Sequence, residues 1–350
     1  DGTVNSVLVF AIDSASDPLF TSVASQTLSV PNLDNEVAGL TLSSLNGGDL
    51  LEGSSAVVSF TVVLDAQPDL SDFVIIDIVS SDTTEASVSS TSTSLVFTNA
   101  NWNIPQVVVV QSVDEFTLDG TTTSSISASI SSSSPVNGFS TLPSQLLSVL
   151  TLDDDVAGFT VGPVNSLDML EGSTDVVSFT VVLDAQPDGS DFVLIDVLSS
   201  DTSEASVNAP SALMFTNANW NIPRTVIVQN VDDLILDGTR TSLISISISS
   251  LSPVNGFSSL PSETITTQIF DNETAGFTIS PVMGDLIEGA LSTASFTLVL
   301  NAGPLSNVAI DLSLNDFGEV ALAGVSSVVF TPSNWNTAQT VTIRSVDDYI

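Results

Sequence analysis

Hydrophobic and polar positions alternate with a period of two over many short stretches of this chain. Between residues 176 and 184, Val177, Phe179, Val181 and Leu183 fall on one side and alternate with Ser, Thr and Val. Such alternation is typical of strands with one buried face. Clusters of Gly, Pro, Asn and Asp separate these stretches at intervals of roughly ten residues, as in β-sandwiches. Because no window has a convincing helical period, the pattern predicts an all-β protein.

The same pattern returns with a period of 118 to 119 residues. The stretch "VVSFTVVLDAQPD" begins at Val57 and again at Val176, and "FTNANWNIP" begins at Phe97 and Phe215, with a shorter copy at Phe330. This period matches a self-contained domain rather than the short unit of a solenoid. The sequence therefore predicts a tandem array of β-sandwiches.

Repeated joint sequences set the expected domain boundaries. "LDNEVAG" ends at Gly39, "LDDDVAG" at Gly158 and "FDNETAG" at Gly276. We expect the last two strands of a preceding repeat, two complete repeats, and a repeat without its last two strands, in residues 1–36, 37–155, 156–273 and 274–350. The end fragments would expose strand edges, to be covered by further repeats of a longer chain or by strands from an identical neighbouring chain. The similarity of the repeats favours a longer array.

Seven strands, A to G, are predicted in the first complete repeat. They cover residues 39–44, 56–64, 73–79, 86–97, 107–113, 121–130 and 145–152. If successive strands run up and down, the A–B, C–D and E–F loops and the end of strand G share one end of the sandwich. The other loops lie at the opposite end.

Composition narrows the function. The chain has no Cys, His or Lys, three Arg, 41 acidic residues and a net charge of −38. It would repel nucleic acid and acidic membranes, and it lacks the residues for a Ser-His-Asp triad, a Cys nucleophile or an ordinary zinc site. No apolar run approaches the ~18 residues that span a membrane. We expect neither an enzyme nor a membrane-inserted segment.

The acidic residues gather in the loops that share one end of each sandwich. Like charges ~4 Å apart cost on the order of 4 kcal/mol near a protein surface, and Ca²⁺ is bound by several carboxylate, carbonyl and water oxygens. The alternative is that acids simply favour solvated turns. The convergence of several loops, twice over, favours calcium; Glu85, Asp155 and Glu204 lie in the same loops. The candidate ligands are Glu52, Asp82, Asp114, Glu115, Asp119, Asp153, Asp154, Glu171, Asp201, Asp232, Asp233, Asp237, Asp271 and Glu273.

Three short motifs carry a resemblance to a known family: an "EG" pair near the start, "VDE" followed by "DG" before strand F, and a terminal "DDD(x)2G". With them the chain resembles Calx-β and related cadherin-like repeats of large bacterial surface adhesins. The resemblance implies Greek-key, immunoglobulin-like sandwiches that bind Ca²⁺ at one end. Two departures, "SDTTEA" in place of "DGTA" and Asn272 in place of an acid, leave the number of ions open. The implied ligands are Glu52, Asp114, Glu115, Asp153, Asp154, Glu171, Asp232, Asp233, Asp271 and Glu273.

The repeated Trp turns lie at the opposite, mostly neutral end. We expect Trp102, Trp220 and Trp335 to cap the core, although an exposed Trp could instead stack on a sugar ring, which makes surface glycans an alternative partner. Adjacent repeats or identical neighbouring chains are the other expected partners.

Together these features predict a calcium-stiffened extracellular array, the stalk or fibre of a cell-surface adhesin. The alternatives are a carbohydrate-binding module array, a strand-donating fibre subunit and an accessory region of a secreted enzyme.

Overall fold

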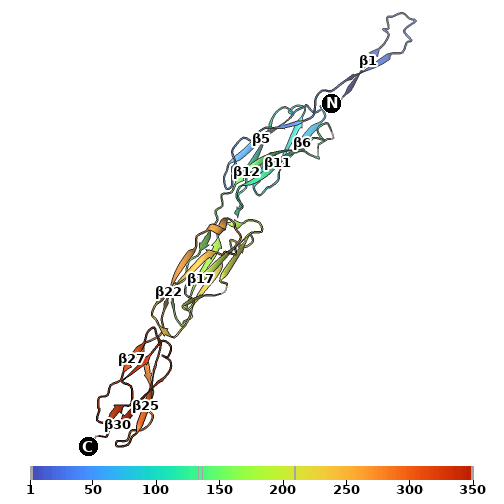
Figure 1. The fold of residues 1–350 in the computed structure, drawn as a ribbon. Coiled ribbons are helices and arrows are strands. Elements are labelled where there is room, and N and C mark those ends of the chain that lie inside the picture. Colours follow the sequence, from blue (N-terminus) through green and yellow to red (C-terminus); the bar gives the residue numbers. More distant parts are fainter. Residues whose placement is uncertain (1–2, 133, 136, 209, 348–350) are drawn as a thin grey trace. The chain divides into compact units, whose positions relative to one another are not determined.

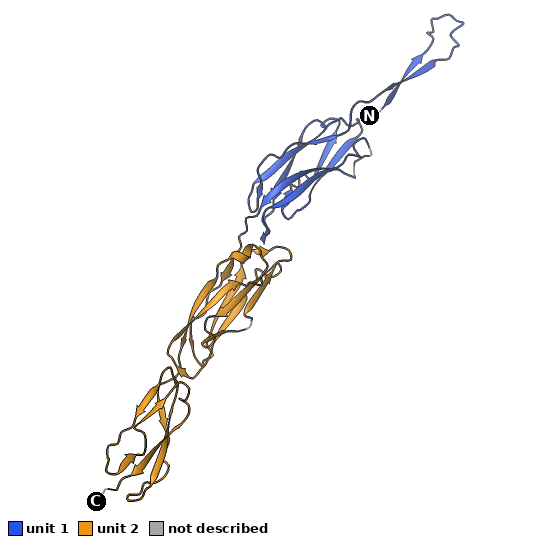
Figure 2. Cartoon of the chain, viewed as in Figure 1, with its two compact units in different colours: residues 1–155 blue, residues 156–350 orange. Residues whose placement is uncertain are grey.

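The computed structural model describes residues 3–132, 134–135, 137–208 and 210–347, and these form an all-β protein (Figure 1). The one helical element in these ranges is the 3₁₀ turn η1 (Gly256–Ser259). The chain divides into two compact units, residues 1–155 and 156–350 (Figure 2). The all-β, immunoglobulin-like prediction is confirmed. The four-part division, whose ends fall on residues outside the described ranges, stays a prediction.

Unit 1 contains a hairpin and a two-sheet sandwich. The hairpin pairs β1 (Val4–Phe10) with β2 (Gln26–Asn32). One sheet has the order β3-β5-β9-β7 and the other β4-β12-β11-β6-β8, with a short strand β10 (Thr117–Leu118) beyond β9. The sheet strands are β3 (Leu40–Leu42), β4 (Leu50–Leu51), β5 (Val57–Leu64), β6 (Phe73–Ser80), β7 (Ala86–Val88), β8 (Ser94–Thr98), β9 (Gln106–Ser112), β11 (Thr122–Ile130) and β12 (Gln145–Leu152).

Unit 2 repeats this sandwich once in full, with the orders β13-β15-β20-β18 and β14-β23-β22-β17-β19. Its strands are β13 (Phe159–Val161), β14 (Asp168–Leu170), β15 (Val176–Leu183), β16 (Gln186–Pro187), β17 (Phe192–Ser199), β18 (Ala205–Val207), β19 (Ala212–Thr216), β20 (Arg224–Asn230), β21 (Ile235–Leu236), β22 (Arg240–Ile248) and β23 (Glu263–Phe270).

A further, partial sandwich completes unit 2, with the orders β24-β25-β30-β28 and β27-β29. Its strands are β24 (Phe277–Ile279), β25 (Thr293–Leu300), β26 (Gly303–Pro304), β27 (Val308–Asp311), β28 (Val320–Leu322), β29 (Ser327–Phe330) and β30 (Gln339–Ser345).

One predicted strand divides between the two sheets, and short strands form outside the predicted ranges, which corrects the seven-strand prediction. Predicted strand D, residues 86–97, is two strands, because β7 pairs with β9 in one sheet and β8 pairs with β6 in the other. A turn between them, in which the Ser92 N–H donates to the Ser89 carbonyl at 2.8 Å, carries the chain across. Predicted strand A, residues 39–44, corresponds to β3, which pairs with β5. The short strand β4 lies outside the predicted ranges and runs parallel to β12.

The core lies between the two sheets. In β5 the alternation predicted from the sequence is seen directly, since Val58, Phe60, Val62 and Leu64 are buried while the residues between them are partly exposed. Each fully buried side chain of this kind contributes about 1.5–3 kcal/mol relative to an exposed one. The register of each strand is therefore fixed, because a slip by one residue would expose this whole row.

The repeated "FTNANWNIP" phrase forms a turn that closes the end of the sandwich opposite to the acidic loops. The Asn101 Oδ1 accepts from the Thr98 N–H at 2.6 Å, and the Asn101 amide donates to the Val96 carbonyl at 3.1 Å. The Trp102 carbonyl accepts from the Leu64 N–H at 3.1 Å, and its half-buried side chain packs against the core. The bond to the Asn Oδ1 and the bond to the Trp carbonyl recur in both later copies.

Replacing Asn101 with Ala is expected to lower the free energy of unfolding by about 1 kcal/mol. The change removes the acceptor for the Thr98 N–H and a donor to Val96, and a typical hydrogen bond contributes about this much. Urea denaturation measures the effect. Asn103, exposed in the same turn, is the matched control; equal losses in Asn101→Ala and Asn103→Ala would contradict the role given to Asn101.

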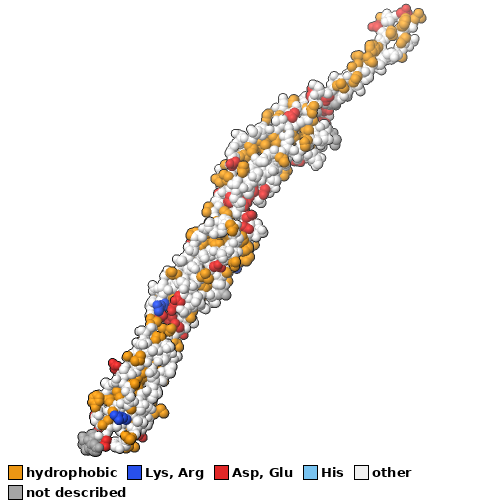
Figure 3. All heavy atoms as spheres, in the orientation of Figure 1, with side chains coloured by type: hydrophobic (Ala, Val, Ile, Leu, Met, Phe, Trp, Pro, Cys, Tyr) orange, Lys and Arg blue, Asp and Glu red, His pale blue; other side chains and the backbone are white. Residues whose placement is uncertain are grey.

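The N-terminal hairpin exposes apolar residues on its surface (Figure 3). Every residue of β1 and β2 is exposed, with Leu8 at 51% and Phe10 at 57%. The corresponding positions of β11, Ile126 and Ala128, are fully buried in the first sandwich. The hairpin thus has the sequence of two inner strands of a sandwich sheet but no core to cover it among the residues described here.

Candidate metal centre

Acidic side chains from separate loops meet at one end of the first sandwich. They come from the loop after β4, the segment before β7, the connection between β9 and β11, and the end of β12. Glu52 and Glu85 are buried, and several carboxylate oxygens of the group lie close together. The acids also raise one another's pKa values through their charges. We call this group cluster 1: Glu52, Glu85, Asp114, Glu115, Asp119, Asp153, Asp154 and Asp155.

Glu52 is the centre of cluster 1. Its side chain is 1% exposed, and neither carboxylate oxygen has a hydrogen-bond partner among the described residues. The parallel pairing of β4 with β12 sets its position, because the Glu52 N–H donates to the Leu152 carbonyl at 3.0 Å. Gly53 follows with a left-handed φ of +63°, and a Cβ on it would lie 2.8 Å from Asp154 Oδ2. The "EG" pair therefore needs glycine for both backbone conformation and space.

Asp153 braces the loops around Glu52. Its two carboxylate oxygens accept from the Gly120 N–H and from the Asp155 N–H, both at 2.7 Å. The "DG" motif before β11 is thereby tied to the "DDD" motif after β12. Glu85 is held from β11, since the Thr122 hydroxyl donates to its Oε2 at 2.6 Å.

The electrostatics of cluster 1 are unfavourable without a cation. Burial, followed by the charges of Glu85, Glu115 and Asp153, raises the pKa of Glu52 to about 8. Burial and then the charge of Asp153 raise the pKa of Asp155 as well. Each carboxylate is therefore destabilised in its charged form by lost hydration and by its neighbours.

The donor atoms of cluster 1 fit Ca²⁺. Oxygens of Glu52, Glu85 and Glu115 lie within 4.8 Å of one another, and so do oxygens of Glu52, Asp154 and Asp155. Buried oxygens without partners on Glu52, Glu115 and Asp155 could all act as ligands. Only oxygen donors are present, which suits a hard cation such as Ca²⁺ rather than a thiolate- or imidazole-bound metal.

Cluster 2 is the equivalent group in the complete sandwich of unit 2. Glu171 is 3% exposed, its N–H donates to the Phe270 carbonyl at 2.9 Å, and its Oε2 has no partner among the described residues. Burial and the charges of Glu204 and Asp233 raise the pKa of Glu171 to about 8. Oxygens of Glu171, Asp271 and Glu273 lie within 4.8 Å of one another. Cluster 2 comprises Glu171, Glu204, Asp232, Asp233, Asp237, Asp271, Asn272 and Glu273.

The structure gives two predicted ligands a different role. Asp82 is exposed, and its Oδ1 accepts from the Thr84 N–H at 3.0 Å and from the Thr84 hydroxyl, which lowers its pKa. Asp201 makes the equivalent turn with Ser203. Neither residue belongs to a group of close acidic oxygens in the described part of the chain. Their carboxylates stabilise turns, and their assignment as ligands stays a prediction.

The buried acids next to these turns are further ligand candidates. Glu85 is 5% exposed and Glu204 is 4% exposed, and each lies in its cluster. Asp155 joins the ligand candidates in the same way. In the sequence, Asp82-x-Thr84 is a typical side-chain-to-backbone turn, but this pattern alone does not show that the following Glu85 faces inward.

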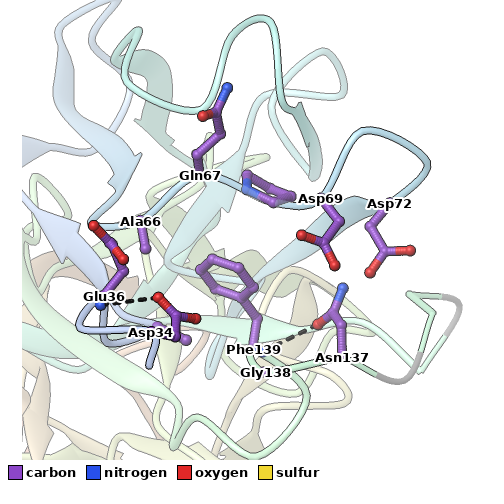
Figure 4. A pocket seen from close by; sticks show the side chains of 11 residues that line it. Asp34, Glu36, Ala66, Gln67, Asp69, Asp72, Asn137, Gly138 and Phe139 are labelled. Carbon is purple, nitrogen blue, oxygen red and sulfur yellow. Dashed lines mark hydrogen bonds between the residues drawn. The ribbon is translucent and has the colours of Figure 1, made fainter. Parts of the chain in front are cut away.

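A second acidic hollow lies at the other end of the first sandwich (Figure 4). This cavity of about 490 Å³ is open, and Asp34, Glu36, Asp69 and Asp72 line it beside Phe139. Glu36 and Asp69 are exposed, and no oxygen of these acids is buried without a partner among the described residues. Solvated acids of this kind do not require an ion, so clusters 1 and 2 are the better candidates.

Comparisons with known proteins show no family for this chain. No protein-family model and no curated protein matches the sequence. Among solved structures, the D0-D1 domain of intimin aligns at 12% identity with a TM-score of 0.23, covering 65% of this chain and 98% of that one. The adhesin InvE of Yersinia pseudotuberculosis aligns at 12% identity with a TM-score of 0.28, covering 73% of this chain and 70% of that one. CBD12 from CALX1.2 aligns at 13% identity with a TM-score of 0.23, covering 64% of this chain and 96% of that one.

TM-scores this low assign no function, so the function has to be argued from the clusters themselves. The membership in the Calx-β group that the motifs suggested stays a prediction. In the residues that the structure describes, no helix has the length and hydrophobicity needed to cross a membrane.

Proposed function

We propose that clusters 1 and 2 bind Ca²⁺ and that the protein is a structural array whose joints calcium stiffens. The observation that carries this is Glu52, a buried carboxylate with both oxygens unpaired among other acids. A buried charge of this kind is strongly unfavourable unless it is paired or bound to a metal. Calcium would supply the missing partner to these oxygens when bound.

The joint inside unit 2 links cluster 2 to the next sandwich. The loop that carries Asp233 and Asp237 also contains β21, which pairs in parallel with β26 of the partial sandwich. The Gly303 N–H donates to the Leu234 carbonyl at 2.7 Å. Leu236 contributes to a small apolar hollow of about 140 Å³ with residues of the partial sandwich. An ion that orders this loop would therefore also order the contact with the next sandwich.

An extracellular setting suits such sites. Loop-built calcium sites of extracellular modules bind at roughly 10⁻⁴ to 10⁻³ M, and calcium at that level is found outside cells rather than in the cytosol. A mechanical role in a surface stalk or fibre accords with repeated sandwiches and the absence of His, Cys and Lys from the sequence. The role is non-catalytic.

The test compares Glu52→Gln with Asp82→Asn in a calcium titration. Each change removes one negative charge, but only Glu52 lies in cluster 1 as the structure shows it. We expect millimolar CaCl₂ to raise the melting temperature of the wild type and of Asp82→Asn, and to raise it less in Glu52→Gln. Hydrogen exchange at the Gly303 amide should slow with calcium, and Glu171→Gln should remove that slowing. No change in melting or exchange with calcium would sink the proposal.

A further inference from the structure

The two clusters share a backbone framework but differ in charge at two positions. Glu52 corresponds to Glu171, and the "DG" and terminal acidic motifs recur. The backbone brace is the same, since the Gly238 N–H donates to Asp271 Oδ2 at 2.7 Å as Gly120 does to Asp153. The charge differs at Asp154, which is Asn272 in the second copy, and at Thr122, which is Arg240. Glu115 and Asp155 are replaced by other acids, Asp233 and Glu273.

Asn272 places an amide where cluster 1 has a carboxylate. Its amide nitrogen donates to the Glu171 carbonyl at 3.0 Å and to Asp232 Oδ1 at 3.1 Å. One negative charge is therefore absent, and an oxygen of Asp232 already has a hydrogen-bond donor. Both oxygens of Glu52 are without a partner among the described residues, whereas only Oε2 of Glu171 is.

Arg240 brings a cation to cluster 2. Its Nε donates to Asp237 Oδ2 at 2.6 Å, and the Asp237 side chain is 8% exposed. At the equivalent place in cluster 1 a neutral hydroxyl, that of Thr122, donates to Glu85. Cluster 2 therefore carries two fewer net negative charges than cluster 1, one from the missing carboxylate and one from the guanidinium.

We infer that the two clusters bind Ca²⁺ with unequal affinity, cluster 1 more tightly by about tenfold or more, with Arg240 and Asn272 setting the difference. The number of ligand charges is one of the factors that tune calcium sites over several powers of ten. The inference rests on the proposed calcium function. It gives the array a graded response, since cluster 2 releases its ion at calcium concentrations that still saturate cluster 1.

Calorimetric titration of the 350-residue chain with CaCl₂ tests this inference through exchanged residues. The variant Asn272→Asp with Arg240→Thr gives cluster 2 the residues of cluster 1 at the two positions where the charge differs. The variant Asp154→Asn with Thr122→Arg does the reverse. The wild type should bind in two phases separated by about tenfold or more. The first variant should bring the weak phase to the tight one, and the second should bring the tight phase to the weak one.

Single variants assign the phases. Glu171→Gln should weaken the weak phase and Glu52→Gln the tight one, and circular dichroism confirms that each variant is folded. Three outcomes would overturn this inference alone. The wild type could bind with equal affinities, the exchanged variants could leave both affinities unchanged, or Glu52→Gln could weaken the weak phase and Glu171→Gln the tight one. A folded wild type that shows no calcium binding overturns the proposed function, and the inference with it.

Discussion

Without calcium, the protein is expected to lose stability as the pH rises from about 5 to about 8. The pKa values of Glu52 and Glu171 are raised to about 8 from an ordinary value of 4.5. Between these values the folded state holds protons that the unfolded state has released. Each unit by which the pH rises therefore lowers the free energy of unfolding. Calcium should remove most of this loss, because a bound ion replaces the protons. Melting temperatures at pH 5, 6.5 and 8, in calcium-free buffer and with CaCl₂, measure both effects.

The double variant Glu52→Gln with Glu171→Gln is the control for general charge repulsion. A net charge of −38 makes the stability of the whole chain depend on pH through general charge repulsion. The variant keeps nearly all of that charge but lacks the two buried carboxylates, so its stability should fall less steeply. Parallel pH profiles for the wild type and the variant would contradict the roles of Glu52 and Glu171.

Replacing Trp102 with Ala is expected to lower the free energy of unfolding of the first sandwich by about 3 kcal/mol. Its side chain is half-buried and packs against the core. The expected loss is therefore at the lower end of the losses measured when a large buried aromatic side chain is replaced by Ala. Chemical denaturation in saturating calcium measures the loss. Trp102→Phe, which keeps an aromatic ring in place, should recover most of it.

The sugar-stacking alternative makes the opposite forecast for the same variants. If Trp102 were a glycan contact, Trp102→Ala would leave stability nearly unchanged and abolish binding on a glycan array. A wild type that binds a glycan through Trp102, with little stability lost in the Ala variant, would replace the cap with a carbohydrate-binding role.

The strands could be predicted because their signal is local. The alternation of residues 56–64 and 145–152 corresponds within a residue to β5 and β12. The division of strand D could not be predicted, because alternation reports which face is buried and not which strand is the partner. In strand D the change of sheet occurs within residues 89–93, a run of Ser and Thr that suits a strand and a turn equally.

The sequence predicts where the candidate site lies, but it does not predict which acidic residues at that end are the ligands. Loop parity brought the "EG", "DG" and "DDD" motifs to one end, and the structure joins them through Glu52, Gly120 and Asp153. Choosing between Asp82 and Glu85 needs side-chain direction. Asp82 turns back onto its own backbone, whereas Glu85 is buried, and a sequence pattern does not fix that direction.

The most direct measurement is a crystal structure of the calcium-loaded protein with anomalous diffraction data. The account predicts an anomalous peak at cluster 1, with carboxylate oxygens of Glu52 and its neighbours at the ~2.3–2.6 Å typical of calcium, and a second peak at cluster 2. Cluster 1 should keep its peak at calcium concentrations where the peak at cluster 2 has faded. A well-ordered structure grown in millimolar calcium, with Glu52 buried and no peak beside it, would contradict the central claim.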